Sequence, residues 1–351
     1  MRIRRTLALI ILAALIVLPA AAGYAAITVK REFTLPAFEG YPYRPRVTGD
    51  WVIANQNSDK NNNSTCQAVN VYNLVTNDVT CAFEGKASWP EAGGNCAVWT
   101  VDPPSAIRSF FADSGDYYPD AGKSNLVILD LATSKYHTPV LPTGSAYQYD
   151  VWGDRVVWTA RGGNGQVCYG TVSTGKQNAQ ITPGRLSRYQ PSVCGNLIVW
   201  IEDDNPSNTS ANSNSAPLQL RAYDIAARRH INIPQDANVR HNSPCSDGKT
   251  IVWWQSGKPN VVMGYDLKTG KVSKIADGYF PDIDNGIVVY MKDVAGQGVV
   301  FGKVLSTGEE FRISKGISNQ GPSISGKWVV WTVSSLDNKI HCAELSGISG
   351  K

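Results

Sequence analysis

Two ten-residue segments of the sequence are nearly the same: residues 191–200 read PSVCGNLIVW, and residues 322–331 read PSISGKWVVW. Five further segments align with this motif when they are anchored on its glycine, and they begin at residues 45, 90, 149, 244 and 281. The seven copies start 37 to 59 residues apart. Self-similarity at such spacing is typical of a repeat protein, whose units stack on their neighbours.

Each position of the motif has a physical reason. The first proline lacks an N–H donor, so it suits the start of a strand. The fifth residue, glycine except for Asn285 in the sixth copy, suits a turn with positive φ. The β-branched run that follows predicts a strand buried on both faces. It ends in Trp99, Trp158, Trp200, Trp253, Tyr290 or Trp331, whereas the first copy has Ala54 there.

A second pair of strands is predicted after each copy. Segments such as VVMGYDLKTGK (261–271) and VVFGKVLSTGE (299–309) carry an apolar strand, a turn and another strand. Each repeat therefore has four antiparallel strands, A to D, and repeats of about 40–45 residues with four strands are blades of a β-propeller. We predict an all-β, seven-bladed β-propeller, with a six- or eight-bladed ring as the alternative.

The last repeat ends too early for a fourth strand. Residues 27–36 (ITVKREFTLP) form an orphan strand ahead of the first copy. We expect them to complete the seventh blade and close the ring, because closure removes two unpaired sheet edges. Residues 27–351 would then form a single propeller domain.

The pattern P-x-x-x-G-x-x-V-V-W followed by Y-D-L-x-T-G resembles the TolB-like family of β-propeller repeats, and the resemblance covers nearly all of the chain after the leader. It implies a propeller fold and little about activity, since one fold hosts many functions. The resemblance does not extend to TolB itself, because only about 18 residues separate the leader from the first copy, where TolB has an α/β domain. The resemblance therefore does not imply a role in the Tol–Pal system.

Residues 1–26 have the features of a secretory signal: Arg2, Arg4 and Arg5, an apolar run and a small-residue end. An uncleaved membrane anchor is the alternative. The leader carries three positive charges and no acid, so the net charge of +4 falls to +1 without it. This balance predicts no nucleic-acid partner and membrane contact only through an uncleaved leader. The expected location is secreted, periplasmic or at the cell surface.

Seven cysteines fit an oxidising compartment, where disulfides persist. Cys66 and Cys81 flank one predicted hairpin, so we predict a disulfide between them. No C-x-x-C or clustered Cys and His suggests a zinc site, and we expect neither a metal nor a cofactor.

One face of the ring is expected to carry the binding site. The longest B–C connections, 55–65, 101–125 and 202–218, emerge there together with the D–A connections. The residues one and two positions before each motif lie at the same rim, and they are rich in aromatic and amide side chains. The predicted ligand-binding rim consists of Tyr43, Arg44, Trp89, Tyr147, Gln148, Tyr189, Gln190, Tyr279 and Phe280. The alternative is that these aromatic residues pack adjacent blades together.

The strand A residues just inside the rim are predicted to face the central channel, and the charged ones are Arg46, Glu91, Asp150 and Asp282. Mixed charges of this kind can simply solvate a water-filled channel. A cation between Asp150 and Asp282 would lack any ligand-spacing motif.

The predicted function is an exported, non-catalytic binding module. None of the four histidines has metal-binding spacing and no G-x-S-x-G elbow occurs, so we assign no catalytic residue. The expected partner is an envelope protein bound at the rim. The alternatives are a glycan, on which Trp89 would stack, and a carbohydrate-active hydrolase or lyase that uses paired carboxylates.

Overall fold

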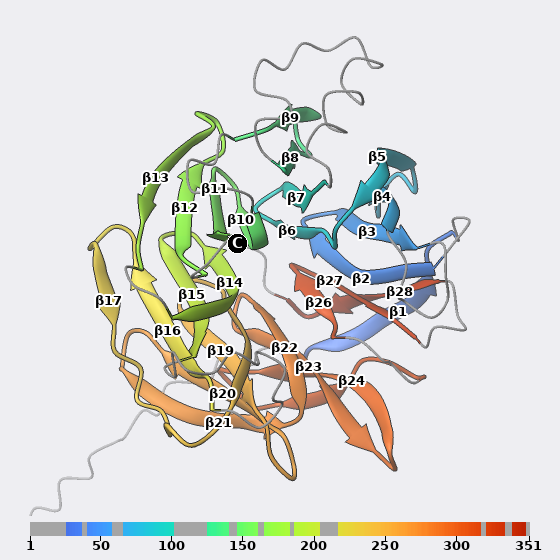
Figure 1. The fold of residues 1–351 in the computed structure, drawn as a ribbon. Coiled ribbons are helices and arrows are strands. Elements are labelled where there is room, and N and C mark those ends of the chain that lie inside the picture. The colour runs from blue at the N-terminus through green and yellow to red at the C-terminus, as the bar shows by residue number, and fades with distance from the viewer. Residues whose placement is uncertain are drawn as a thin grey trace, which may run out of the picture.

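The computed structural model describes residues 26–36, 41–57, 66–101, 125–139, 146–160, 165–182, 186–203, 217–316, 321–333 and 339–348. These residues form seven four-stranded antiparallel sheets and no helix. The sheets stand radially around a central channel, like the blades of a propeller (Figure 1). The predicted seven-bladed fold is therefore confirmed, and the six- and eight-bladed alternatives are wrong.

The four strands of each blade run from the channel outward. The innermost strands are β2 (Tyr41–Thr48), β6 (Glu91–Gly93), β10 (Ala146–Trp152), β14 (Ser187–Cys194), β18 (His241–Ser246), β22 (Tyr279–Asp284) and β26 (Ser323–Ser325). The second strands are β3 (Trp51–Asn57), β7 (Cys96–Thr100), β11 (Arg155–Ala160), β15 (Leu197–Asp203), β19 (Thr250–Gln255), β23 (Ile287–Val294) and β27 (Trp328–Thr332).

The outer half of each blade completes the sheet. The third strands are β4 (Cys66–Asn73), β8 (Leu126–Asp130), β12 (Val167–Thr171), β16 (Gln219–Asp224), β20 (Val261–Asp266), β24 (Gln297–Val304) and β28 (Ile340–Ser346). The outermost strands are β5 (Val79–Ala87), β9 (Lys135–His137), β13 (Lys176–Gln180), β17 (Arg229–Ile231), β21 (Lys271–Asp277), β25 (Glu310–Arg312) and, in the seventh blade, β1 (Thr28–Thr34).

The turn between the first two strands of each blade uses the fifth motif residue. This residue has φ between +50° and +83° in all seven copies, a conformation that glycine and asparagine tolerate best. The residues are Gly49, Gly94, Gly153, Gly195, Gly248, Asn285 and Gly326.

The described residues form seven separate hydrophobic clusters, one between each pair of adjacent blades. The aromatic residue that ends the motif in six of its seven copies lies in one of them and is essentially inaccessible to solvent, as Trp99, Trp200 and Tyr290 illustrate. Because every blade contributes to two clusters, no blade has a core of its own.

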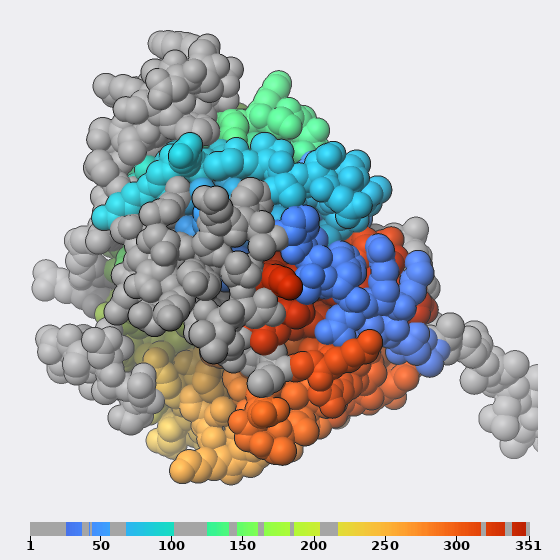
Figure 2. Space-filling model, turned by 90° about the vertical axis from the view of Figure 1, so that its right-hand side faces the viewer, coloured from blue at the N-terminus to red at the C-terminus, as the bar shows by residue number. Residues whose placement is uncertain are grey.

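The chain ends of the ring meet in the seventh blade. β1 pairs antiparallel with β28, with Phe33 opposite Cys342. In Figure 2 the N-terminal residues (blue) adjoin the C-terminal ones (red) on this side of the molecule. Glu344 of β28, buried to 6% exposure, accepts hydrogen bonds from Lys30 at 3.3 Å and Arg31 at 2.7 Å. The N-terminal strand therefore closes the ring, as predicted.

The predicted disulfide between Cys66 and Cys81 is wrong. Cys81 has a free thiol. In the β4–β5 ladder Cys66 lies opposite Ala87 and Cys81 opposite Asn70, so the two cysteines are four residues out of register. Four residues of strand span about 13 Å, which exceeds the Cα separation of a disulfide. The hairpin that they flank contains a register shift that the spacing in sequence does not reveal.

The predicted leader, apart from its last residue, lies outside the described residues, as does most of each long B–C connection. Within the described ranges, no helix is long and apolar enough to cross a membrane.

Candidate binding site at the channel mouth

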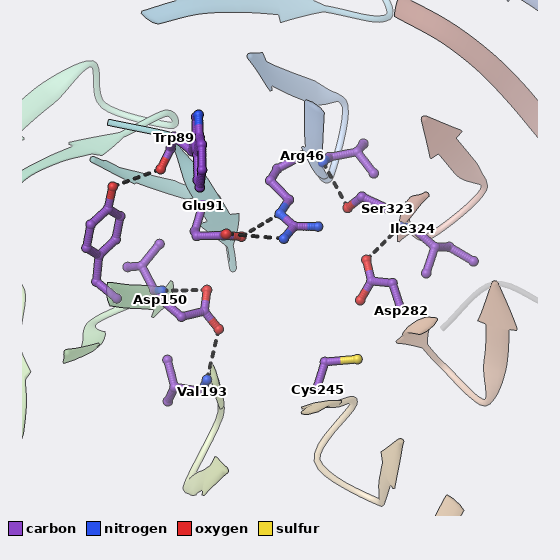
Figure 3. Close-up of polar contacts among 12 residues, drawn as sticks. Arg46, Trp89, Glu91, Asp150, Val193, Cys245, Asp282, Ser323 and Ile324 are labelled. Carbon is purple, nitrogen blue, oxygen red and sulfur yellow. Dashed lines mark hydrogen bonds and ion pairs between the residues drawn. The ribbon is translucent and has the colours of Figure 1, made fainter. Parts of the chain in front are cut away.

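The second residue of every motif copy lies on the wall of the central channel. These seven residues, one from each blade, are Arg46, Glu91, Asp150, Ser192, Cys245, Asp282 and Ser323. They line a cavity of about 660 Å³ that also reaches the residues before each motif. Figure 3 shows these wall residues, apart from Ser192, around the channel. A volume of this size lies in the range of small-molecule and peptide pockets.

Arg46 and Glu91, from the first two blades, form an ion pair across the channel wall. The Arg46 Nε contacts Glu91 Oε2, and Arg46 Nη2 donates to Glu91 Oε1 at 3.1 Å. Burial acts to lower the pKa of Arg46, but Glu91 outweighs it and holds this pKa above its ordinary value. The Arg46 guanidinium therefore stays charged and bonds to both carboxyl oxygens of Glu91.

Asp150 and Asp282 hold adjacent blades together. Asp150 Oδ1 accepts from the N–H of Val151 at 2.8 Å, and Oδ2 accepts from Val193 of the next blade at 2.9 Å. Asp282 repeats the pattern, and its Oδ2 accepts from the N–H of Ile324 at 3.0 Å. Both carboxylates are thus fixed at the channel wall, on opposite sides of the channel (Figure 3).

Burial shifts the protonation of both carboxyls. Burial, together with the nearby Glu91, raises the pKa of Asp150 to about 7, although hydrogen bonds from Val193 and Ser192 act in the opposite direction. Burial also raises the pKa of Asp282, where Arg46 opposes the shift. Asp150 therefore changes charge near neutral pH.

Four innermost strands carry a bulge where the chain enters the channel mouth. Each bulge has a non-glycine residue with φ between +46° and +51° directly before the motif proline: Arg44, Gln190, Ser243 and Phe280. A residue before proline is restricted toward extended conformations, so these positions store backbone strain. All four residues line the cavity.

Glutamine side chains connect the bulges of neighbouring blades. Gln148 Oε1 accepts from the N–H of Gln190 at 2.5 Å, and Gln190 Oε1 accepts from the N–H of Ser243 at 2.7 Å. This chain of bonds ties the mouth of the third, fourth and fifth blades into one rigid arc.

Trp89 stands at the mouth between the first and third blades. Its side chain is 44% exposed, and the guanidinium carbon of Arg44 lies 4.7 Å from its ring centroid. Tyr149 takes the first motif position of the third blade, where the other copies have proline, and its hydroxyl donates to the Trp89 carbonyl at 2.8 Å. The same hydroxyl contacts Ser88 Oγ. Tyr147, 58% exposed, also lines the cavity.

A second aromatic group lies beside the mouth in the fifth and sixth blades. Trp254, Tyr279 and Phe280 contact one another with ring centroids 5.3 to 6.2 Å apart. Gly321 leaves room for this group, because a Cβ there would lie 2.8 Å from the Cβ of Phe280. Trp254 was not a predicted site residue. Strand alternation could have found it, since its neighbour Trp253 points into the core.

Six of the nine predicted rim residues line the cavity, and so do all four predicted channel residues. The six are Arg44, Trp89, Tyr147, Gln148, Gln190 and Phe280. Tyr189 and Tyr279 do not line the cavity: Tyr189 packs against the core between the fourth and fifth blades, and Tyr279 donates to Asp293 at 3.1 Å. The side chain of Tyr43 lies outside the described residues.

Cys245, Trp152 and Asp284 are among the cavity residues that were not predicted from the sequence. Cys245 occupies the same motif position as Asp150 and could have been found from it. Its Sγ donates to the Pro281 carbonyl at 3.4 Å, and burial raises the pKa of this thiol well above its ordinary value. Trp152, at the fourth position of its motif, lines the cavity two residues further along β10.

His241, the histidine nearest a motif start, lies in the interior and not at the mouth. It is completely buried, and its Nε2 lies 3.2 Å from the Asp236 carbonyl oxygen. Among the residues that the structure describes, no three His, Cys, Asp or Glu side chains are grouped as a metal ion would require.

The fold and the lined channel define a seven-bladed β-propeller. No family model and no curated protein matches the sequence. Among solved structures, the chain is similar to the β-propeller domain of the Trilobed protease from Pyrococcus furiosus, with 13% identity, a TM-score of 0.60, and coverage of 90% of this chain and 97% of that one.

Two further similar structures are a lyase and TolB. An oligogalacturonate lyase from Vibrio parahaemolyticus shows 11% identity and a TM-score of 0.55, covering 91% of this chain and 98% of the lyase. TolB from Acinetobacter baumannii shows 13% identity over 75% of this chain and 63% of its own, with a TM-score of only 0.47. At such identities the similarities to the Trilobed protease domain and to the lyase support the fold and leave the function open.

Proposed function

We propose that this protein is an exported, non-catalytic binding protein that recognises a partner protein of the cell envelope at the channel mouth. The observation that carries the proposal is the pair of exposed aromatic side chains, Trp89 and Tyr147, beside a deep cavity with a rigid, polar wall. Large rigid rings next to fixed hydrogen-bonding groups are typical of protein interfaces.

The bonding of the channel carboxylates favours binding over catalysis. Asp150 and Asp282 each accept backbone N–H groups from two blades, and Glu91 is paired with Arg46. A glycosidase needs one carboxyl that protonates the leaving group and another that is free to attack or to activate water. The sequence motif further supports assignment of the repeats to the TolB-like group, and the leader supports export.

A glycan is the second candidate ligand, and Trp89 favours it specifically. An exposed indole ring can stack on the apolar face of a sugar, and the channel carboxylates can accept hydrogen bonds from hydroxyl groups. In that case loss of Trp89 alone would abolish binding, whereas a protein partner would tolerate the loss of one aromatic residue.

The test is capture of envelope proteins and polysaccharides by the full-length chain and by two variants. Trp89→Ala/Tyr147→Ala removes the exposed rings at the mouth. Val75→Ala removes an apolar side chain, 63% exposed, in the turn after β4, and serves as the control. We expect the control to retain a protein that the double variant loses, with direct binding of the purified protein confirming the interaction.

Other outcomes of the capture experiment contradict the proposal. Retention by the double variant at the native level would move the site away from the mouth. Capture of polysaccharide only, lost with Trp89→Ala alone, would replace the protein partner by a glycan.

A further inference from the structure

The charges on the cavity wall are unbalanced. Its described lining contains two arginines and four carboxylates, and these are Arg44, Arg46, Glu91, Asp150, Asp282 and Asp284. Beside the ion pair of Arg46 with Glu91, the lining has three more carboxylates and one more cation, Arg44, which lies at the mouth against Trp89. Arg46 also attracts Asp150 and Asp282. A narrow channel with low-dielectric walls focuses such a field.

Asp150 and Asp282 have no ion-pair partner among the described side chains, and their backbone bonds occupy only part of their accepting capacity. An ionised carboxylate offers about four lone-pair sites. Each of the two carboxylates uses one for its own strand and one for an N–H group of the next blade, and a serine hydroxyl of that blade, Ser192 or Ser323, bonds to it as well. The remaining sites are held in place before any ligand arrives, which lowers the entropic cost of binding.

The geometry favours an organic cation over a metal ion. The carboxylates stand on opposite sides of the channel (Figure 3), and no metal-sized group of three ligands forms among the described residues. A long side chain with a charged tip fits this arrangement. Its aliphatic part would pass the rings of Trp89 and Phe280 at the mouth, and aromatic rings also attract cations.

We propose that the channel takes a lysine or arginine side chain of the partner protein, with the ammonium or guanidinium group held between Asp150 and Asp282. This inference rests on the proposed function and names the chemistry of its ligand. Asp284, whose Oδ2 accepts from the N–H of Gly326 at 2.6 Å, extends the acidic wall further along β22.

Four synthetic octapeptides test the proposal by calorimetric titration of the full-length chain. They have blocked ends and a Gly/Ser sequence with one central lysine, arginine, norleucine or glutamate. We expect the lysine and arginine peptides to bind about tenfold more tightly than the norleucine peptide, because norleucine matches lysine in shape and lacks the charge. Equal binding of the four peptides, or binding of none, would overturn the proposal.

Variants of the ring identify the groups responsible. Asp150→Asn and Asp282→Asn should each weaken the lysine peptide several-fold and leave the norleucine peptide unchanged. Asp78→Asn makes the same change at an exposed position between β4 and β5, outside the cavity lining, and should leave all affinities unchanged. If the lysine preference persists in both asparagine variants, the assigned position of the cation is wrong. Tight binding of free 1,5-diaminopentane with no preference for the lysine peptide would replace the side chain by a small amine.

The affinity for the lysine peptide at lower pH provides a second test of the proposal. The charged and titratable groups that face Asp150 are Glu91 on β6 and, further around the channel, Arg46, Cys245 and Asp282. Because burial raises the pKa of Asp150 to about 7, its carboxyl becomes neutral below that pH. Affinity for the lysine peptide should therefore fall as the pH is lowered from about 8 to about 5. Affinity that is constant across this range would count against the proposal.

Failure of this inference is distinguishable from failure of the proposed function. If the captured partner is lost with Trp89→Ala/Tyr147→Ala and retained with Asp150→Asn, the mouth binds a partner that inserts no cation. If neither variant changes capture, both the site and the ligand chemistry are wrong.

Discussion

Tyr149 is the single departure from proline at the first motif position, and its hydroxyl explains the exception. Removing that hydroxyl in Tyr149→Phe leaves the ring packed but deprives the Trp89 carbonyl of its donor. We expect a loss of about 1–3 kcal/mol in the free energy of unfolding, because a buried polar group loses its partner. Urea denaturation measures the loss, and Tyr147→Phe, with an exposed hydroxyl, should be unchanged. Equal stability of the two variants would contradict the role of Tyr149.

Asp150 makes the stability of the protein depend on pH. Its folded-state pKa is raised to about 7 by burial, so folding favours the neutral carboxyl. The stability that this preference contributes is complete below the unfolded pKa of about 4 and is lost as the pH rises through about 7. Asp150→Asn removes the titration. The melting temperature of the variant relative to the native protein should therefore increase from pH 4 to pH 8, and a constant difference would show that Asp150 is not the group responsible.

The closing strand β1 depends on the ionised form of Glu344. Burial opposes ionisation, but hydrogen bonds from Lys327, Arg31 and Lys30 outweigh it and lower the pKa of Glu344 to about 2. Such a carboxyl stabilises the fold above its unfolded pKa, and the contribution is lost as the pH falls toward 2. We expect Glu344→Gln to cost about 1 kcal/mol at neutral pH, since its three cationic partners are about half exposed and screened.

The cost of Glu344→Gln should shrink below pH 4 and in high salt. Thermal melts across pH and ionic strength measure it, with Glu309→Gln at an exposed turn as the matched control. A deficit that persists unchanged at pH 2 would show that the loss comes from packing.

At the level of strands, the features that recur in every blade could be predicted from the sequence, whereas the features of a single blade could not. The turn residues and the closing strand were predictable because one register recurs seven times. The wrong pairing of Cys66 with Cys81 came from the β4–β5 hairpin, whose register shifts have no counterpart in the motif. Among the tyrosines, Tyr147 is exposed whereas Tyr189 packs into the core. This difference in exposure depends on contacts with neighbouring blades, which the spacing of the motif copies does not specify.

The seven clusters between blades make the whole ring one cooperative unit. Trp200 is completely buried between the third and fourth blades, so Trp200→Ala should lower the free energy of unfolding by about 3–5 kcal/mol. The transition should remain single in both fluorescence and circular dichroism, because the loss is shared around the ring. Trp152→Ala, at a partly exposed position, should have a smaller effect. A second, separate transition would mean that the third and fourth blades unfold independently.

The pairing of β1 with β28 also determines when the ring can close while the chain is being synthesised. Thr28 lies opposite Ser346, so β1 is made well before the strand with which it pairs. Until then the first and seventh blades cannot share their cluster, and the wall of the channel has a gap beside Arg46. A chain that ends before β28 would therefore lack a closed channel, even though all of the described residues that line the cavity had already been made.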